Sequence, residues 1–413
     1  MSERMRRYLL SLLIGLSLCL GASAQVEGDS VEASLLTCSP GREVYSLYAH
    51  TAISVQNHTQ GIDAVFNYGA FDFTTEHFLW RFILGKCDYE IQAMPFSEFV
   101  TFYQHRGSGI VEQQLNLTND EANRLFALLV INCQPQNRTY RYNLLTNNCT
   151  TKARDQIEAA VDGTVVYEEM QEHPTCREVL HEYTEDYPWV EQGNDLLLGA
   201  ACDTVMSART EMFLPERLMA YFAHAQIYDE INNRRPLVSK TTELLAARNT
   251  NLPQEKGFPL SPLLTGMVVF VVFLLIVWLE YAIRRMLWGV DIVVMTAQGL
   301  AGCLLCFMFL FSQHPMLDSN WQVALLNPIP LFCMPWVVKC AIQHRTCPYH
   351  YLNFLWLVLF IVFMPWIPQQ FSTMTLPVAL ALLTRPVSYY IHYNRRTPQG
   401  RVVTSEKVED KQK

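Results

Sequence analysis

Long apolar runs and alternating apolar segments occupy different parts of the chain. Uncharged and mostly apolar runs are confined to the last third, at 257–279, 292–317, 319–338 and 346–384. A membrane-spanning helix needs about twenty such residues. The last run is too long for one span, and its Pro365-Trp366-Ile367-Pro368 segment divides it. We therefore predict five spanning helices, at about 260–280, 292–312, 321–339, 351–367 and 372–392.

The N-terminus has the pattern of an export signal. Arg4, Arg6 and Arg7 precede an apolar stretch from Tyr8 to Leu20, and Ala22-Ser23-Ala24 follows as a small-residue cleavage site. Residues 1–24 are therefore expected to be a signal peptide, with an uncleaved membrane anchor as the alternative. We expect the next domain to fold outside the cytoplasm.

Between these apolar ends, short segments alternate between strand and helix patterns. Thr118-Asn119-Asp120-Glu121 fits a capping box and predicts a helix to about Ile131. Strands are expected at 45–56, 64–71, 87–93, 110–117 and 139–144, and further helices at 96–105 and 152–161. This gives an α+β exported domain at 25–235, a polar juxtamembrane linker at 236–258, a transmembrane domain at 259–396 and a cytoplasmic tail at 397–413.

The charge distribution supports this division. The net charge of −8 divides into +2 for residues 1–24, −15 for 25–258 and +5 for 259–413. With the 25–258 segment outside, each basic cluster of the last third falls on a predicted cytoplasmic loop or on the tail. The C-terminus is therefore expected in the cytoplasm. Nucleic acid is excluded as a partner, because no part large enough to fold alone combines a packed core with a basic surface.

Candidate chemistry concentrates on Cys149 and His50. Asn148 is a good N-cap, so Cys149 is expected in the first turn of a helix, where the dipole and free N–H groups stabilise a thiolate or an oxyanion. His50 begins a predicted strand and could serve as the base. Asn67, on the next strand, could orient the imidazole if the two strands pair antiparallel. The alternatives are a half-buried structural His50 and a disulfide-bonded Cys149, since the exported segment has cysteines at 38, 87, 133, 149, 176 and 202.

One polar motif lies at membrane depth. Asn327-Pro328-Ile329-Pro330 occurs near the outer end of the third predicted span, after a polar outer loop that begins at His314-Pro315. Such a patch could recognise a lipid head group, or it could be a helix kink. The histidines show no metal-ligand spacing, and we expect neither a metal nor a cofactor.

These motifs together carry a family resemblance that covers most of residues 35–340. The chain resembles the Lnb family of membrane lipoprotein N-acyltransferases, although Ala49 and Asn147 stand where the family usually has Gly and Asp. The matching stretches are Tyr48-Ala49-His50-Thr51-Ala52, Phe66-Asn67-Tyr68-Gly69-Ala70-Phe71-Asp72-Phe73, Gly85-Lys86, Glu112-Gln113-Gln114-Leu115, Asn147-Asn148-Cys149-Thr150-Thr151, Asp195-Leu196-Leu197-Leu198-Gly199, Phe213-Leu214-Pro215, and His314-Pro315 through Asn327-Pro328.

The resemblance implies a fold and a reaction. The His-before-Cys order resembles circularly permuted papain-like (NlpC-like) folds, here fused to a five-helix transmembrane bundle. Carried over, Cys149 is the nucleophile, His50 the base and Asn67 the orienting residue, and Tyr48, Asn148 and Asn327 are expected to contact substrate. The implied partners are lipid-modified proteins and membrane phospholipid, and the implied location is the inner membrane.

The implied reaction moves an acyl chain from a glyceryl ester, through a Cys149 thioester, to the α-amine of a lipidated N-terminal cysteine. A membrane-anchored NlpC-type peptidase or amidase acting on cell wall would use the same Cys and His. A non-enzymatic membrane sensor would instead have a bridged, unreactive Cys149. The sequence alone leaves both alternatives open.

Overall fold

The computed structural model describes residues 30–72, 74–169, 172–229, 233–248, 258–343 and 345–396. The predicted signal peptide and the predicted cytoplasmic tail lie outside these residues. The chain forms two compact units. The first takes the residues up to Pro174 and those from Val205 to Gln254, and the second takes Thr175–Thr204 and the chain from Glu255 onward.

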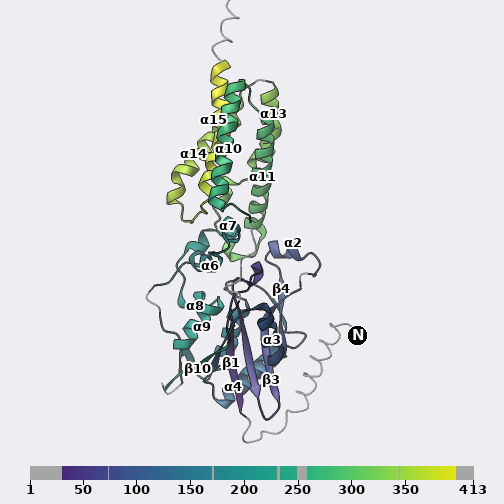
Figure 1. The fold of residues 1–413 in the computed structure, drawn as a ribbon, viewed down its shortest axis with the longest axis vertical. Helices are drawn as coiled ribbons and strands as arrows, with labels where there is room; N and C mark the ends of the chain where they lie inside the picture. Colours follow the sequence, from purple (N-terminus) through teal and green to yellow (C-terminus); the bar gives the residue numbers. More distant parts are fainter. Residues whose placement is uncertain are drawn as a thin grey trace, which may run out of the picture. The chain divides into compact units, whose positions relative to one another are not determined.

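The first unit is built on a seven-stranded sheet (Figure 1). Its order is β10-β5-β1-β2-β3-β4-β6, and every neighbouring pair is antiparallel. The strands are β1 (Val31–Cys38), β2 (His50–Asn57), β3 (Ile62–Ala70), β4 (Asp88–Pro95), β5 (Ile110–Leu115), β6 (Thr139–Arg141) and β10 (Val238–Leu245). A second, three-stranded sheet joins β7 (Thr164–Val166), β8 (Gln226–Tyr228) and β9 (Arg234–Pro236).

Both faces of the large sheet are covered by helices, because side chains alternate along a strand. Leu35 and Ile53 belong to a core with α4 (Asn119–Asn132), α5 (Cys149–Ala160) and α9 (Pro215–His224). Leu36 and Ala52, each one residue away, belong to a separate core with α3 (Phe96–Arg106). The unit also contains η1 (Val44–Ser46), α2 (Phe78–Ile83) and α8 (Ala208–Glu211).

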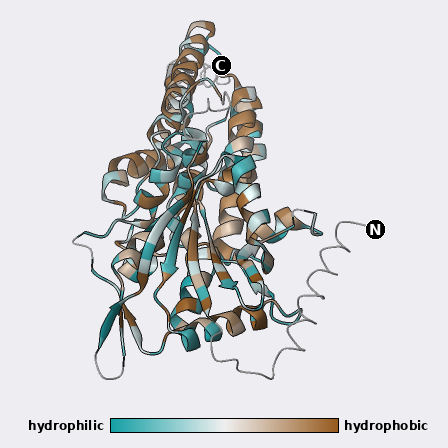
Figure 2. Cartoon of the chain, turned by 60° about the horizontal axis from the view of Figure 1, so that its bottom comes forward, coloured by the Kyte–Doolittle hydropathy of each residue, from teal (hydrophilic) through white to brown (hydrophobic). Residues whose placement is uncertain are grey.

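The second unit contains long apolar helices (Figure 2). From residue 262 onward the helices of this unit are α10 (Pro262–Ile283), α11 (Trp288–Phe311), the short α12 (Gln322–Leu325), α13 (Ile329–Ile342), α14 (Pro348–Phe363) and α15 (Thr375–Arg396). By length and composition, four stretches of the described chain could cross a membrane: Pro262–Ile283, Trp288–Phe311, Gln322–Ile342 and Pro348–Trp366. The expected fifth span is helical as α15 but is not among these four, and it contains Arg385.

A buried ion cluster holds α15 against its neighbours. The Arg385 guanidinium donates to Glu280 Oε1 at 3.0 Å and to Asp291 Oδ1 at 2.8 Å. Glu280 is fully buried, and Asp291 and Arg385 are 2% and 4% exposed. Removing one partner from such a cluster leaves an uncompensated buried charge. These three residues therefore connect α10, α11 and α15.

The second unit also includes a segment from the expected exported domain. Residues Thr175–Thr204 group with the helical unit and form α6 (Cys176–Thr184), α7 (Pro188–Leu197) and η2 (Ala200–Asp203). They contact the loops that contain η4 (Pro315–Leu317) and η5 (Met364–Trp366): Gly199 N–H donates to Met316 O at 2.8 Å, and Gln369 Nε2 donates to Leu198 O at 3.2 Å. We call residues 175–204 the insert.

Two local expectations were wrong. The expected linker at 236–258 contains β10, which pairs with β5. The strand expected from Tyr45 begins only at His50, because Val44–Ser46 is a 3-10 turn and Ala49 has a positive φ of 62°. The expected third span is among the four candidate stretches, as Gln322–Ile342, and its helix has the expected kink as a break between α12 and α13, where Pro328 has no N–H to continue a helix.

Candidate active site

Two adjacent strands bring His50 and Asn67 together. β2 and β3 pair antiparallel, with Ile53 opposite Phe66. His50 lies at the start of β2 and Asn67 near the end of β3, and the Asn67 Oδ1 atom is 3.2 Å from His50 Nε2. The pairing that the sequence required for this contact is therefore present. The His50 ring also stacks on Tyr103 of α3, with 6.4 Å between centroids.

Cys149 is the first residue of α5, and Asn148 is its N-cap. Asn148 Oδ1 accepts the N–H groups of Thr150 and Thr151, each at 2.9 Å. Its Nδ2 donates to the carbonyls of Leu144 and Phe213. These four bonds use every donor and acceptor of the amide. The geometry therefore favours Asn148 as a structural cap, and a substrate contact by its side chain would require breaking one of these bonds.

The N-terminus of α5 is fixed to β2 beside the imidazole. Thr150 Oγ1 and Thr51 Oγ1 are 3.1 Å apart, and both residues are fully buried. The Cys149 Sγ atom is 3.7 Å from Thr150 Oγ1, and the His50 side chain and the Thr51 N–H lie beside the thiol and act on its pKa. The structure thus brings together the three residues for which the sequence predicts catalytic roles.

These contacts change the acidity of both groups. Burial raises the pKa of Cys149, but the His50 charge and the polar groups of His50, Thr51 and Thr150 outweigh burial and lower the pKa to about 7. For His50, burial lowers the pKa, and the neighbouring Cys149 thiolate together with Asn67 raises it above its ordinary value. Each charged form stabilises the other, so the pair favours thiolate and imidazolium.

Gly69 leaves space beside the thiol. It has a φ of +96° in an irregular part of β3, between Asn67 and Ala70. A Cβ atom there would lie 3.6 Å from Cys149 Cβ, 3.9 Å from His50 Cε1 and 4.0 Å from Tyr140 Oη. Glycine is suited to this position, because it adopts positive φ without strain and lets other groups approach closely.

Two buried polar atoms near the thiol lack a hydrogen-bond partner among the described residues. They are Asn67 Nδ2 and the Tyr140 hydroxyl. Buried polar atoms without partners are rare and call for an explanation. Sequence reasoning did not single out Tyr140, because β6 has three residues and shows no pattern that points to a site. Its position is evident only once β6 pairs with β4 at the edge of the sheet.

The other two expected contact residues have different local surroundings. Tyr48 is half-buried in the loop before β2. Asn327 belongs to the second unit, between α12 and α13, where its Oδ1 accepts the Ile329 N–H at 3.1 Å and its Nδ2 donates to Ala324 O at 3.3 Å. The side chain of Asn327 thus satisfies backbone groups at a helix break. Its predicted contact with substrate stays a prediction.

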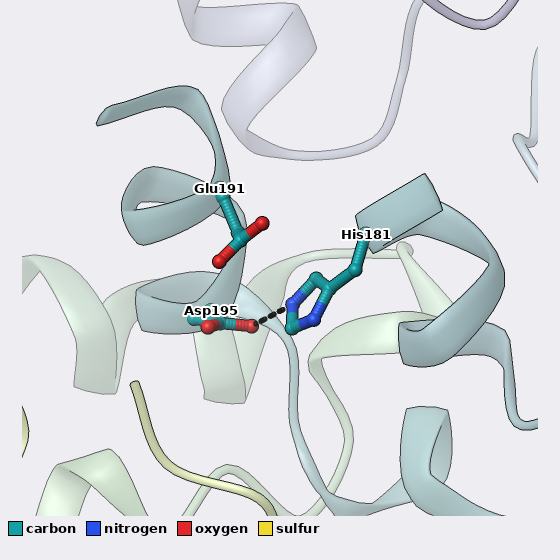
Figure 3. Close-up of side chains that lie close together, drawn as sticks. All are labelled: His181, Glu191 and Asp195. Atoms are coloured by element: carbon teal, nitrogen blue, oxygen red, sulfur yellow. Dashed lines mark hydrogen bonds and ion pairs between the residues drawn. The ribbon is translucent and has the colours of Figure 1, made fainter. Parts of the chain in front are cut away.

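One cluster of the described residues offers metal-binding atoms. His181, Glu191 and Asp195 each place one such atom within 4.8 Å of the others (Figure 3). However, Asp195 Oδ1 accepts from Arg177 Nη1 at 2.7 Å and lies 2.9 Å from His181 Nε2. Since Arg177 already supplies the positive charge that this carboxylate needs, we assign no metal here.

The chain combines a sheet domain, which contains a thiol of lowered pKa, with helices that could cross a membrane. This combination defines the class: a membrane protein whose candidate nucleophile, Cys149, is not in a candidate span. Family comparison gives the more specific assignment. Residues 21–182 match the Lnb N-terminal periplasmic domain, and residues 253–397 match the Lnb transmembrane domain. The chain belongs to the Lnb family, and its domains are those of a multi-pass inner-membrane protein with a periplasmic N-terminal domain. Comparisons with curated proteins and with solved structures gave no match.

Proposed function

We propose that this protein is a cysteine-dependent lipoprotein N-acyltransferase. The observation that carries the proposal is the Cys149 thiol at the start of α5, beside a His50 imidazole that lowers its pKa and itself contacts Asn67. The Lnb domains add a link to lipoprotein modification. The substrate class is a protein with a lipidated N-terminal cysteine, and the acyl donor is a glyceryl ester in the membrane.

The first half of the reaction forms a thioester. The Cys149 thiolate attacks the ester carbonyl and forms a tetrahedral intermediate with a negative oxygen. The intermediate collapses, the ester C–O bond breaks, and His50 gives its proton to the departing glyceryl oxygen. The acyl group is then bonded to Cys149 Sγ, and His50 is neutral.

The second half transfers the acyl group to nitrogen. The free α-amine attacks the thioester carbonyl, and His50 accepts the proton that the amine loses. The C–S bond breaks, the amide is released, and the thiolate–imidazolium pair is restored. Asn67 holds the imidazole in one orientation through both halves.

The oxyanion of the intermediate needs hydrogen-bond donors that are not already bonded within the protein. The Thr150 and Thr151 amides are bonded to Asn148, so they are not the free donors that the helix N-terminus alone suggested. The Cys149 amide is the candidate that remains in this turn. We assign the second donor to the Tyr140 hydroxyl, which is buried, without a partner among the described residues and close to the space beside Gly69.

We further propose the topology and fold that the sequence predicts. The exported domain is papain-like in the permuted order, five helices cross the inner membrane, and the C-terminus is cytoplasmic. Arg385 in the fifth helix is neutralised by Glu280 and Asp291, which is how a charged residue is accommodated at membrane depth. Cysteine accessibility at residue 405, after Ser405→Cys, from each side of the membrane tests the tail's location.

A trapping experiment tests the chemistry. Purified full-length protein is incubated with a diacylated lipopeptide whose α-amine is blocked, and intact mass is then measured. We expect one added acyl chain that hydroxylamine removes, absent in Cys149→Ala and retained in Cys133→Ala. Cys133 is a suitable control because burial raises its pKa to about 12. Cleavage of cell-wall peptides without acyl gain would instead support the peptidase alternative.

A further inference from the structure

The insert belongs to a different compact unit from the residues that flank it in the sequence. Residues on both sides of Thr175–Thr204 belong to the first unit, while the insert itself belongs to the second. It is docked there by hydrogen bonds to its backbone, including those that the Asn320 Nδ2 atom donates to the carbonyls of Leu196 and Leu197, both at 3.0 Å. The chain therefore enters and leaves the second unit at the two ends of the insert.

A cysteine lies near each of these ends. Cys176 begins α6, one residue after the insert starts, and Cys202 is in η2, two residues before it ends. Both are buried, with 4% and 1% of their surface exposed. Both thiols are free in the structure, and the Cys202 thiol donates to Met316 O at 3.7 Å. The Cys202 thiol is also near enough to Cys176 to raise its pKa, so the two cysteines are neighbours inside one unit.

The residues that follow each cysteine are also paired. Arg177 donates to Asp203, with Nε to Oδ1 at 2.6 Å and Nη2 to Oδ2 at 3.0 Å. Arg177 is fully buried and also donates to Asp195, the carboxylate that Figure 3 shows beside His181. This two-bond pairing of adjacent residues fixes the backbone at Cys176 against the backbone at Cys202.

The compartment favours oxidation of such a pair. Cys176 lies within the match to the Lnb N-terminal periplasmic domain, and the periplasm is an oxidising environment. In the folded protein, the neighbouring Cys202 thiol and burial raise the pKa of Cys176, so its thiol would be a poor nucleophile after folding. Oxidation would therefore take place during export, before the thiols are buried.

We propose that Cys176 and Cys202 form a disulfide bond that closes the insert at its base. Each thiol loses one proton and one electron, and the Sγ–Sγ bond forms. The electrons and protons pass by thiol–disulfide exchange to the disulfide of a periplasmic dithiol oxidase, which becomes a dithiol. The bond restricts the unfolded loop between residues 176 and 202 and so favours the docked insert. It does not depend on the acyl-transfer proposal.

Differential labelling tests this bond directly. Cells are quenched with a small alkylating agent, and the full-length protein is denatured and treated with a mass-tagged maleimide either after or without reduction. We expect two additional tags only after reduction, and proteolysis without reduction should yield one linked peptide pair containing Cys176 and Cys202. Equal tagging in both samples, or a linked pair with other cysteines, would overturn the proposal.

Matched variants make the assignment specific. Cys176→Ser and Cys202→Ser should each abolish the difference between reduced and non-reduced samples, because each removes one half of the bond. Cys133→Ser should leave the two-tag difference unchanged. Persistence of the difference in Cys176→Ser would contradict the pairing, and because the readout is made on denatured protein it does not require the variants to be fully stable.

Discussion

Asn67 Oδ1 lies 3.2 Å from Nε2 of His50, on the strand that pairs with the strand of His50. This contact fixes the imidazole relative to Cys149, which opens a helix packed on the same sheet. Three residues distant in sequence thus converge because one antiparallel hairpin and one helix N-terminus meet.

Asn67→Ala should slow turnover without abolishing it. The variant leaves the nucleophile and the base in place but removes the group that orients the imidazole. We expect kcat to fall about 10- to 100-fold, less than the whole contribution of about 10²–10⁴ from general acid–base catalysis. Steady-state kinetics with a diacylated lipopeptide measures this. A fall in kcat as large as that caused by Cys149→Ala would contradict a purely orienting role for Asn67.

Alkylation of Cys149 should depend on pH with a midpoint near the lowered pKa of about 7. Below this pH the thiol is protonated and slow, and above it the thiolate reacts. In His50→Ala the attractive charge is gone while burial remains, so the midpoint should move up to or above the ordinary value of 9.0. Iodoacetamide rates across pH measure both. An unshifted midpoint in His50→Ala would rule out the ion pair.

Gly69→Ala should affect the site more than an equivalent change elsewhere. The residue has φ +96°, so we expect the substitution to lower the free energy of unfolding by about 1–2 kcal/mol. The new methyl group would lie 3.6 Å from Cys149 Cβ. Gly61→Ala is the matched control, with φ +66° and no heavy atom within 4 Å. Thermal unfolding and activity should show similar destabilisation for both variants and lost turnover for Gly69→Ala alone.

Tyr140→Phe should lower kcat with little effect on stability. The change removes a buried hydroxyl that has no partner among the described residues, so the folded protein loses no hydrogen bond there. An oxyanion donor is worth about 10²–10³ in kcat. The rate of Cys149 alkylation should remain unchanged, because that reaction forms no oxyanion. If Tyr140→Phe has the kcat of the wild type, the Tyr140 hydroxyl does not stabilise the oxyanion.

Arg385→Met should destabilise the helical unit. The variant leaves Glu280 and Asp291 buried without their cation, and breaking a buried pair costs about 3–5 kcal/mol. Thermal unfolding in detergent measures the loss. A triple variant that also carries Glu280→Gln and Asp291→Asn should recover part of it, because no buried charge is then left unpaired.

Local signals in the sequence predicted the site better than they predicted the sheet. The capping box at Thr118 and Glu121 is present, and Cys149 follows the Asn148 cap as expected. The sequence does not predict β1, because buried Ser34 and Thr37 interrupt its apolar pattern although it lies inside the sheet, between β5 and β2. β10 was read as linker, because an exposed edge strand has little apolar periodicity.

The role of Tyr140 and the grouping of the insert depend on long-range contacts. Tyr140 comes near the thiol through the pairing of β4 with β6. The insert is assigned to the helical unit by bonds such as Gly199 N–H to Met316 O, between residues far apart in sequence. A pattern within a short window of sequence holds no information on such contacts.

The N-terminal structure of a lipoprotein from cells that depend on this protein tests the central claim most directly. Mass spectrometry should find an N-acylated terminal cysteine with the wild-type chain and with Cys133→Ala. With Cys149→Ala, produced at the same level in the membrane, it should find the free α-amine and both original ester-linked chains. N-acylation that persists with Cys149→Ala would contradict the account.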